Sequence, residues 1–106
     1  MGDFKMIIRE WRGRALKPNE AAYPTHFRTN VVPELRHMPG FLGADLSQRQ
    51  INDEIEYLVL TRWASMEAVR GFAGDDMAKA VVEPGAVAAL ADFDDSVQHY
   101  EVIESV

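Results

Sequence analysis

Apolar and polar residues alternate along four segments of the chain with the two-residue period that is typical of β-strands. These segments are residues 4–14, 41–49, 55–63 and 97–103. In the first segment, Ile7, Arg9 and Trp11 share one face, while Ile8 and Glu10 share the other. Both faces therefore carry apolar side chains, although an antiparallel sheet with one face in water needs only one apolar face.

A helical repeat lies between the first two predicted strands. Its apolar positions are spaced by four, four and three residues: Phe27, Val31, Leu35 and Met38. Tyr23 and His26 extend the same stripe towards the N-terminus. Because Pro24 and Pro33 each remove a backbone donor, we expect a bent helix or one whose regular part starts near Pro24.

A second helical region follows the third predicted strand. Ser65 is a candidate N-cap, and the apolar stripe that includes Phe72 belongs to a short helix that Gly74 can end. After residues 83–85, Glu-Pro-Gly, an alanine-rich stretch that reaches Leu90 predicts one more short helix.

The order of these elements is strand, helix, strand, strand, helix, strand. It predicts an α+β, ferredoxin-like βαββαβ fold, in which one four-stranded antiparallel sheet carries helices on one face. The helices leave the other face open, yet Ile8, Leu58 and Leu60 belong to it. Since a large exposed apolar face promotes aggregation in a monomer, we expect a symmetric homodimer that joins two sheets face to face.

Length and charge narrow the class of protein. The 106 residues form a single domain, and the absence of cysteine excludes disulfides, thiolate metal sites and thiol nucleophiles. The net charge of −6 argues against electrostatic binding to nucleic acid or to an anionic membrane. No apolar run approaches the roughly 20 residues that span a bilayer, and the first five residues lack the pattern of a signal peptide. We therefore expect a cytoplasmic protein.

The three histidines are the first candidates for chemistry. His26 borders the apolar stripe of the predicted helix, where it is either a base that titrates near neutrality or a packed histidine bonded to a backbone carbonyl. His99, in the last predicted strand, is either a second candidate base or an inter-strand hydrogen-bonding partner. His37 at a helix end interacts favourably with the helix dipole. The three are too scattered along the sequence to predict a metal site.

Arg9 and Glu10 are the charged residues of the first predicted strand, and they point to opposite faces. Whichever of them faces the helices is a charge near the core that needs a partner or a ligand. An internal salt bridge, for instance with Arg62 or Glu56, is the ordinary outcome.

Three stretches that span most of the chain carry a family resemblance. They are Val32-Pro33-Glu34-Leu35 leading into Pro39-Gly40-Phe41-Leu42-Gly43, Tyr57-Leu58-Val59-Leu60-Thr61-Arg62-Trp63 followed by Ala64-Ser65-Met66-Glu67-Ala68, and the closing Val97-Gln98-His99-Tyr100-Glu101-Val102. In these stretches the chain resembles the antibiotic biosynthesis monooxygenase family of dimeric α+β barrel proteins. The resemblance implies one such domain over residues 1–106, with the fold and the sheet-to-sheet dimer expected above.

The resemblance also implies a range of activities. Some members oxidise polycyclic phenols or anthrones with O₂ and without metal or flavin, and others degrade haem or oxidise quinols. The cofactor-free reaction needs a base, which His26 or His99 would supply, and a group that stabilises the substrate anion. Arg9 or Arg62 would provide the latter. Three aromatic side chains would form the walls of the substrate site: Tyr23, Trp63 and Phe72.

Haem degradation is disfavoured by the same comparison. The haem-degrading members use an Asn, a Trp and a His ligand. This chain has Glu10 near the Asn position and Phe72 near the Trp position. It has no histidine between Asp75 and Val82, where the haem ligand would lie.

Two functions follow from the sequence. The first is a cofactor-independent monooxygenase that oxidises a small aromatic, polyketide- or quinol-like metabolite, with no bound metal or cofactor. The second is a non-catalytic dimeric protein that binds a small hydrophobic or aromatic molecule or serves in a stress response. A cavity between helices and sheet that contains His26 or His99 would favour the enzyme. A core filled there by Phe27, Phe72 and Leu60 would favour the binding protein.

Overall fold

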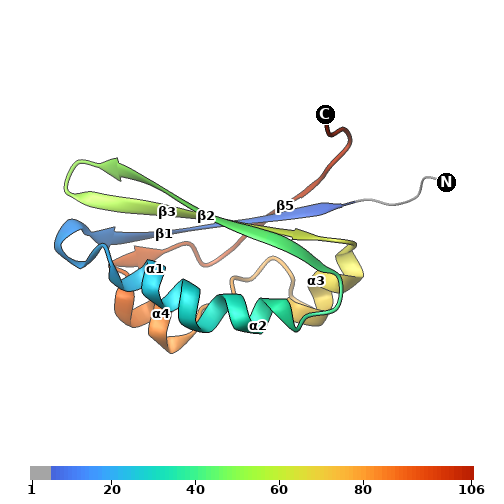
Figure 1. Ribbon diagram of the computed structural model, residues 1–106, viewed down its shortest axis with the longest axis horizontal. Coiled ribbons are helices and arrows are strands. Elements are labelled where there is room, and N and C mark those ends of the chain that lie inside the picture. The colour runs from blue at the N-terminus through green and yellow to red at the C-terminus, as the bar shows by residue number, and fades with distance from the viewer. Residues whose placement is uncertain (1–5) are drawn as a thin grey trace.

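The computed structural model describes residues 6–106, so Phe4 and Lys5 of the first predicted strand lie outside the described residues. A twisted antiparallel sheet forms one layer, and short helices cover one of its faces (Figure 1). The strands are β1 (Ile7–Leu16), β2 (Phe41–Ile51), β3 (Glu54–Trp63), β4 (Asp92–Phe93) and β5 (Gln98–Glu101). Their order is β2-β3-β1, and β4 and β5 both pair with the remaining edge of β1. The α+β, ferredoxin-like prediction is confirmed, with β4 as an additional short strand.

The chain between β1 and β2 is helical but irregular. It contains a 3₁₀ turn, η1 (Lys17–Asn19), then α1 (Ala22–His26), a π-helical segment η2 (Phe27–Val31) and α2 (Val32–Arg36). The two prolines predicted a bent helix or one whose regular part starts near Pro24; the structure has a wide π-helical segment between two short α-helical ones, the first of which contains Pro24. Pro33 contributes to this irregularity, because this residue offers no N–H to the preceding turn.

Two further helices follow β3. Helix α3 (Met66–Ala73) starts where predicted, since the Ser65 hydroxyl accepts a hydrogen bond of 3.1 Å from the Ala68 amide. It ends at Gly74, whose φ of 84° is readily adopted only by glycine. Helix α4 (Pro84–Ala89) is the predicted alanine-rich helix.

Buried side chains form two clusters between the sheet and the helices. The central cluster lies under α1 and α4 and consists of Ala15, Tyr23, Phe27, Ile55, Tyr57, Val59, Ala86, Ala89 and Leu90. The tryptophan cluster lies under α3 and consists of Ile7, Leu35, Trp63 and Val69. The regular alternation of β3, in which every second residue is buried, supplies members to both clusters.

The outer face of the sheet combines apolar and paired charged side chains. By register, Ile8, Leu58 and Leu60 lie on this face, as predicted, and Tyr100 of β5 lies beside Ile8. Four arginines form ion pairs around them. Arg14 pairs with three carboxylates, those of Glu56, Asp92 and Asp94. The other pairs are Arg12 with Glu10, Arg49 with Glu56, and Arg62 with Asp45. This face is open in the single chain, and the homodimer stays a prediction.

Within residues 6–106, no helix combines the length and the apolarity needed to cross a bilayer. The cytoplasmic location stays a prediction.

Candidate functional site

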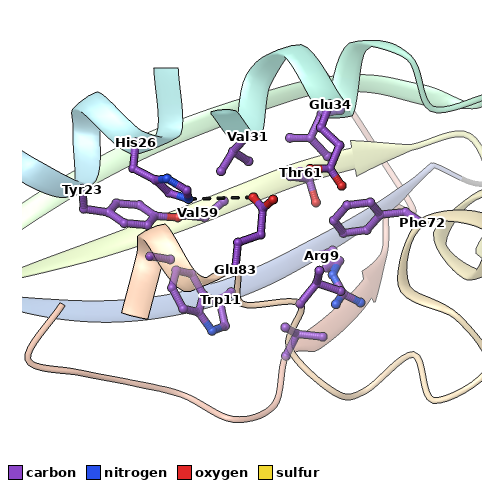
Figure 2. Close-up of a pocket in the computed structure, with 14 residues that line it drawn as sticks. Arg9, Trp11, Tyr23, His26, Val31, Glu34, Val59, Thr61, Phe72 and Glu83 are labelled. Atoms are coloured by element: carbon purple, nitrogen blue, oxygen red, sulfur yellow. Dashed lines mark ion pairs between the residues drawn. The ribbon is translucent and has the colours of Figure 1, made fainter. Parts of the chain in front are cut away.

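A cavity of about 70 Å³ lies between the inner face of the sheet and the helices. Strands β1 and β3 line one side of the cavity. The helices between β1 and β2, together with the chain before α4, line the other side (Figure 2). Its lining consists of Arg9, Trp11, Tyr23, His26, Val31, Glu34, Leu35, Val59, Thr61, Phe72, Val81, Glu83, Ala86 and Val97. Most of these side chains are apolar, so a ligand in this cavity would contact only a few polar groups.

Strand alternation and helical spacing bring those polar groups together. Arg9 and Trp11 are two residues apart in β1 and therefore share the inner face, where Arg9 pairs with Thr61 of β3. Tyr23 and His26 are three residues apart on α1 and therefore lie on the same side of the helix. The periodicity of each element thus accounts for one part of the lining.

His26 has the most unusual environment in the cavity. Its side chain is 10% exposed, and its Nε2 atom is buried without a hydrogen-bond partner among the described residues. The carboxylate oxygen Oε1 of Glu83 lies 3.8 Å from Nε2, too far for a hydrogen bond. A buried polar atom without a partner is costly, so its presence beside a cavity points to a ligand or water.

Gly85 sets the position of the His26 ring. A Cβ atom at Gly85 would lie 2.6 Å from Nδ1 of His26 and 2.7 Å from Cε1. The start of α4 can therefore approach the imidazole only because residue 85 has no side chain. The ring of Tyr23, with its centroid 6.0 Å away, packs near His26 as well.

Two carboxyl groups meet at the mouth of the cavity. Partial burial, followed by the charge of Glu83 and a hydrogen bond with its carboxyl group, raises the pKa of Glu34. Burial, followed by the charge of Glu83, also raises the pKa of Tyr23 well above its usual range. Glu83 thus lies close to His26, Tyr23 and Glu34, although it comes from a different part of the chain.

Arg9 is a buried cation, only 5% exposed, on the sheet side of the cavity. It donates hydrogen bonds to the carbonyl oxygens of Met77 at 2.7 Å and Lys79 at 3.0 Å. A third contact, of 3.0 Å, joins it to Nε2 of His99, which must act as the acceptor because a guanidinium has only donors. Burial lowers the pKa of Arg9 to about 10, so the side chain is still charged at neutral pH.

His99 contacts Arg9 from the neighbouring strand. Burial, and then the positive charge of Arg9, lowers the pKa of His99. The imidazole therefore favours its neutral form, with the proton on Nδ1 while Nε2 accepts from Arg9. Of the two interpretations made from the sequence, the geometry matches the inter-strand hydrogen bond.

Of the six residues predicted for the site, four line the cavity: Arg9, Tyr23, His26 and Phe72. His99 is joined to it through Arg9. Trp63 lies elsewhere, fully buried in the tryptophan cluster, where its ring stacks on Phe72 at 5.3 Å. Their functional roles stay predictions.

Two charged residues lie on the outer face of the sheet: Glu10, which points away from Arg9 as predicted, and Arg62, whose predicted role of stabilising the substrate anion does not fit this position. Glu10 points to the outer face, where it pairs with Arg12 at 2.7 Å, so it cannot take part in a site on the helix side. Arg62 also lies on the outer face and pairs with Asp45. The expected internal salt bridge of Arg9 is replaced by its bonds to two carbonyl groups and to neutral His99.

Glu34 and Glu83 are the charged residues of the site that sequence reasoning missed. Glu34 borders the apolar stripe of the helical segment, and that position is a signal which could have identified it. Glu83 precedes a proline and a glycine, a pattern that predicts only the start of a helix. Its approach to His26 depends on the packing of α4 against α1. Among residues 6–106, the His, Asp and Glu side chains form no group of three or more that could hold a metal ion.

A model of the family described as antibiotic biosynthesis monooxygenase matches residues 6–84 of the chain. That range covers β1 through to the start of α4 and includes all the polar groups of the cavity that were named above. No curated protein matches the chain.

Solved structures share the fold over nearly the whole chain. A protein from Caulobacter crescentus CB15, assigned as an antibiotic biosynthesis monooxygenase, is 21% identical with a TM-score of 0.71, covering 95% of this chain and 92% of that chain. SnoaB, a cofactor-independent oxygenase from Streptomyces nogalater, is 15% identical with a TM-score of 0.57, and the coverages are 99% and 98%. The haem-degrading MhuD of Mycobacterium tuberculosis is 21% identical with a TM-score of 0.58, and the coverages are 93% and 98%. At these identities the similarity establishes the fold.

Proposed function

The chain belongs to the antibiotic biosynthesis monooxygenase family, and we propose on this premise that it is a monooxygenase that oxidises a small aromatic, quinol-like metabolite with O₂ and without a bound cofactor. The observation that carries the proposal is the buried Nε2 atom of His26, which has no hydrogen-bond partner among residues 6–106 and lies beside a largely apolar cavity. An imidazole in this position is suited to accept a proton from a bound substrate.

The size of the cavity supports a small substrate. Its volume of about 70 Å³ is well below the roughly 300–1,000 Å³ of sites for drug-sized ligands. The space favours a single aromatic ring over fused rings, and it is far too small for a haem. Tyr23, Trp11 and Phe72 provide aromatic walls against which a planar ring can pack.

The proposed reaction begins with proton transfer from the substrate to Nε2 of His26. The substrate anion then passes one electron to O₂, and the resulting radical and superoxide combine into a hydroperoxide once a proton is returned. For a single-ring phenol that carries hydrogen on the carbon opposite its hydroxyl, loss of water from that hydroperoxide leaves a second carbonyl group, so the phenol and O₂ yield a quinone and H₂O. Arg9, a buried cation in the same cavity, would favour the negative charge of the intermediates.

Oxygen uptake tests this proposal most directly. We expect the native protein to consume O₂ with at least one member of a panel of single-ring phenols and hydroquinones. Replacing His26 with Ala removes the proton acceptor and should lower kcat by about 10²–10⁴-fold. His37→Ala is the matched control, because His37 is exposed just after α2 and lies outside the cavity.

The outcome separates the two functions predicted from the sequence. A native protein that binds single-ring ligands but consumes no O₂ with any substrate would contradict the enzyme and favour the non-catalytic binding protein. Activity that is unchanged in His26→Ala would contradict the assigned base.

The proposal includes a homodimer formed through the outer face of the sheet. Ile8, Leu58 and Leu60 form the apolar part of that face in a single chain, and Tyr100 beside them is 52% exposed. We expect sedimentation at micromolar concentration to give the mass of two chains. Leu60→Glu should shift the protein towards the monomer, because it adds a negative charge next to Glu10 and Asp45. A native monomer would contradict the dimer.

A further inference from the structure

Glu83 places a carboxylate in an otherwise largely apolar cavity. Figure 2 shows its side chain extending from the chain before α4 towards His26 and the helical segment. It occupies the N-cap position of α4, but its side chain makes no capping hydrogen bond there. The side chain is 38% exposed, and across the cavity its Oε1 atom lies 3.8 Å from Nε2 of His26.

The gap between Glu83 and His26 has the dimensions of a bridging site. Nε2 and Oε1 are 3.8 Å apart, and each hydrogen bond to an oxygen atom spans about 2.7–3.0 Å. One ligand oxygen can therefore lie within hydrogen-bonding distance of both atoms. The 90% burial of the His26 side chain and its unpartnered Nε2 atom are an independent sign that something bonds there.

The charges around the gap favour a neutral ligand. On one side lie the carboxyl groups of Glu83 and Glu34, and burial, followed by the charge of Glu83, raises the pKa of Glu34. On the sheet side, Arg9 carries a buried positive charge. A ligand carboxylate would meet the negative charge of Glu83, and a ligand ammonium would lose its hydration in a largely apolar cavity whose lining already includes the buried cation Arg9.

A hydroxyl group satisfies both atoms of the gap at once. Its hydrogen is donated to Oε1 of Glu83, and its oxygen accepts a hydrogen bond from Nε2 of His26 in the tautomer that carries a proton there. In the other tautomer, with the proton on Nδ1, the hydroxyl turns its hydrogen to Nε2, and the carboxylate then favours the imidazolium that proton transfer forms.

We propose, on the premise of the function above, that Glu83 is a specificity-determining residue that selects neutral, hydroxyl-bearing rings and rejects rings carrying a carboxylate. The hydroxyl binds between Glu83 and His26. Because this selection concerns binding, it can be measured without turnover.

The test is a set of NMR titrations under nitrogen at neutral pH with four single-ring probes: phenol, methoxybenzene, benzoate and benzylamine. We expect the native protein to bind phenol about tenfold more tightly than any of the other three, as the loss of a hydrogen bond to a charged group predicts. Glu83→Gln keeps the size of the side chain but removes its charge. It should abolish the discrimination against benzoate and weaken phenol binding.

Glu67→Gln is the matched control, since Glu67 is an exposed carboxylate in the first turn of α3. It should keep the native order of affinities. Thermal unfolding of each variant establishes that the folded protein is being compared.

Several outcomes would overturn the inference. They are equal binding of phenol and methoxybenzene, tighter binding of benzylamine than of phenol, no binding of any probe, or an unchanged order of affinities in Glu83→Gln. Failure of the proposed function is a different result, because selective phenol binding without O₂ uptake would remove the oxidation and leave the role of Glu83. Conversely, O₂ uptake with no selectivity would remove only the role of Glu83.

Discussion

The tryptophan cluster and the cavity lie side by side on the same face of the sheet, and their interiors differ sharply. Trp63 is fully buried, stacks on Phe72 and packs edge to face against Phe41 at 5.4 Å. Its Nε1 atom donates a hydrogen bond of 2.8 Å to the Thr61 hydroxyl. The indole nitrogen is the one polar atom of the Trp63 side chain, and it is hydrogen-bonded.

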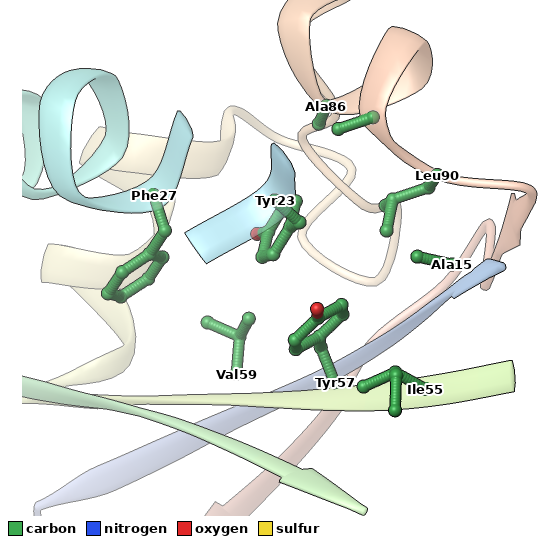
Figure 3. Packing of buried hydrophobic residues seen from close by; sticks show 9 residues of the cluster. Ala15, Tyr23, Phe27, Ile55, Tyr57, Val59, Ala86 and Leu90 are labelled. Carbon is green, nitrogen blue, oxygen red and sulfur yellow. The ribbon is translucent and has the colours of Figure 1, made fainter. Parts of the chain in front are cut away.

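The cavity contains the opposite arrangement. His26 Nε2 is buried without a partner, two carboxyl groups are adjacent, and Arg9 is a buried cation. Tyr23 and Val59 line this cavity and also belong to the central cluster, where they lie near Phe27 (Figure 3). Strained or unsatisfied groups tend to cluster at functional sites, so the contrast supports the cavity as the proposed site.

The largest effect is expected in the tryptophan cluster. Trp63→Ala removes the stacking on Phe72 and leaves the buried Thr61 hydroxyl without its donor. The free energy of unfolding should fall by about 3–5 kcal/mol, as measured by urea denaturation. Trp63→Phe keeps an aromatic ring and should lower the free energy of unfolding clearly less. If Trp63→Ala lowered the free energy of unfolding no more than a substitution at an exposed position does, the tryptophan cluster would not be a main source of stability.

An intermediate effect is expected where α4 contacts His26. Gly85→Ala places a methyl group 2.6 Å from Nδ1 of His26 and should lower the free energy of unfolding by about 1–3 kcal/mol through overpacking. It should also shift the NMR signals of the His26 ring. The control is Gly71→Ala in α3, where the added Cβ meets no atom within 4 Å and should stabilise the helix by up to about 1 kcal/mol. Similar effects at the two glycines would contradict the close approach.

The smallest effect is expected at the contact between Arg9 and His99. Because the folded pKa of His99 is lowered from 6.5, the unfolded chain binds more protons than the folded one as the pH falls through that value. The contribution of His99 to stability is thus present above pH 6.5 and is lost on acidification.

Urea denaturation of native protein and His99→Gln between pH 7.5 and pH 5.5 measures this contribution. Glutamine keeps an acceptor for Arg9 but does not titrate in this range. The variant should show a shallower loss of stability, and the difference should correspond to a fraction of one proton. If the free energies of unfolding of the native protein and of His99→Gln changed in parallel with pH, the result would contradict the contact between Arg9 and a neutral His99.

Most of the fold was predictable because local periodicity determines it. The alternation in residues 55–63 defines β3 and its buried face, and Ser65 and Gly74 mark the two ends of α3. The π-helical segment was foreseen only as an irregularity. The short strand β4 was not foreseen, because its two residues depend on pairing with Gly13 and Arg14 of β1.

The site was predictable only in part. His26, Tyr23 and Phe72 lie on apolar stripes and reach the cavity for that reason. Trp63 belongs to the same face of β3 as Thr61 and Val59, but its place at the strand end puts it under α3. Strand periodicity specifies which face a residue occupies and says nothing of which helix covers it.

The sequence by itself determined the order of the elements, the inner and outer faces of the strands and the likeness to a family. Each of these follows from spacing along the chain. Only the tertiary structure decided that Glu83 lies beside His26, that Glu34 faces Glu83 and that His99 accepts a hydrogen bond from Arg9. These contacts join residues up to 90 positions apart, and the packing of α4 and β5 against elements from the first third of the chain brings them together.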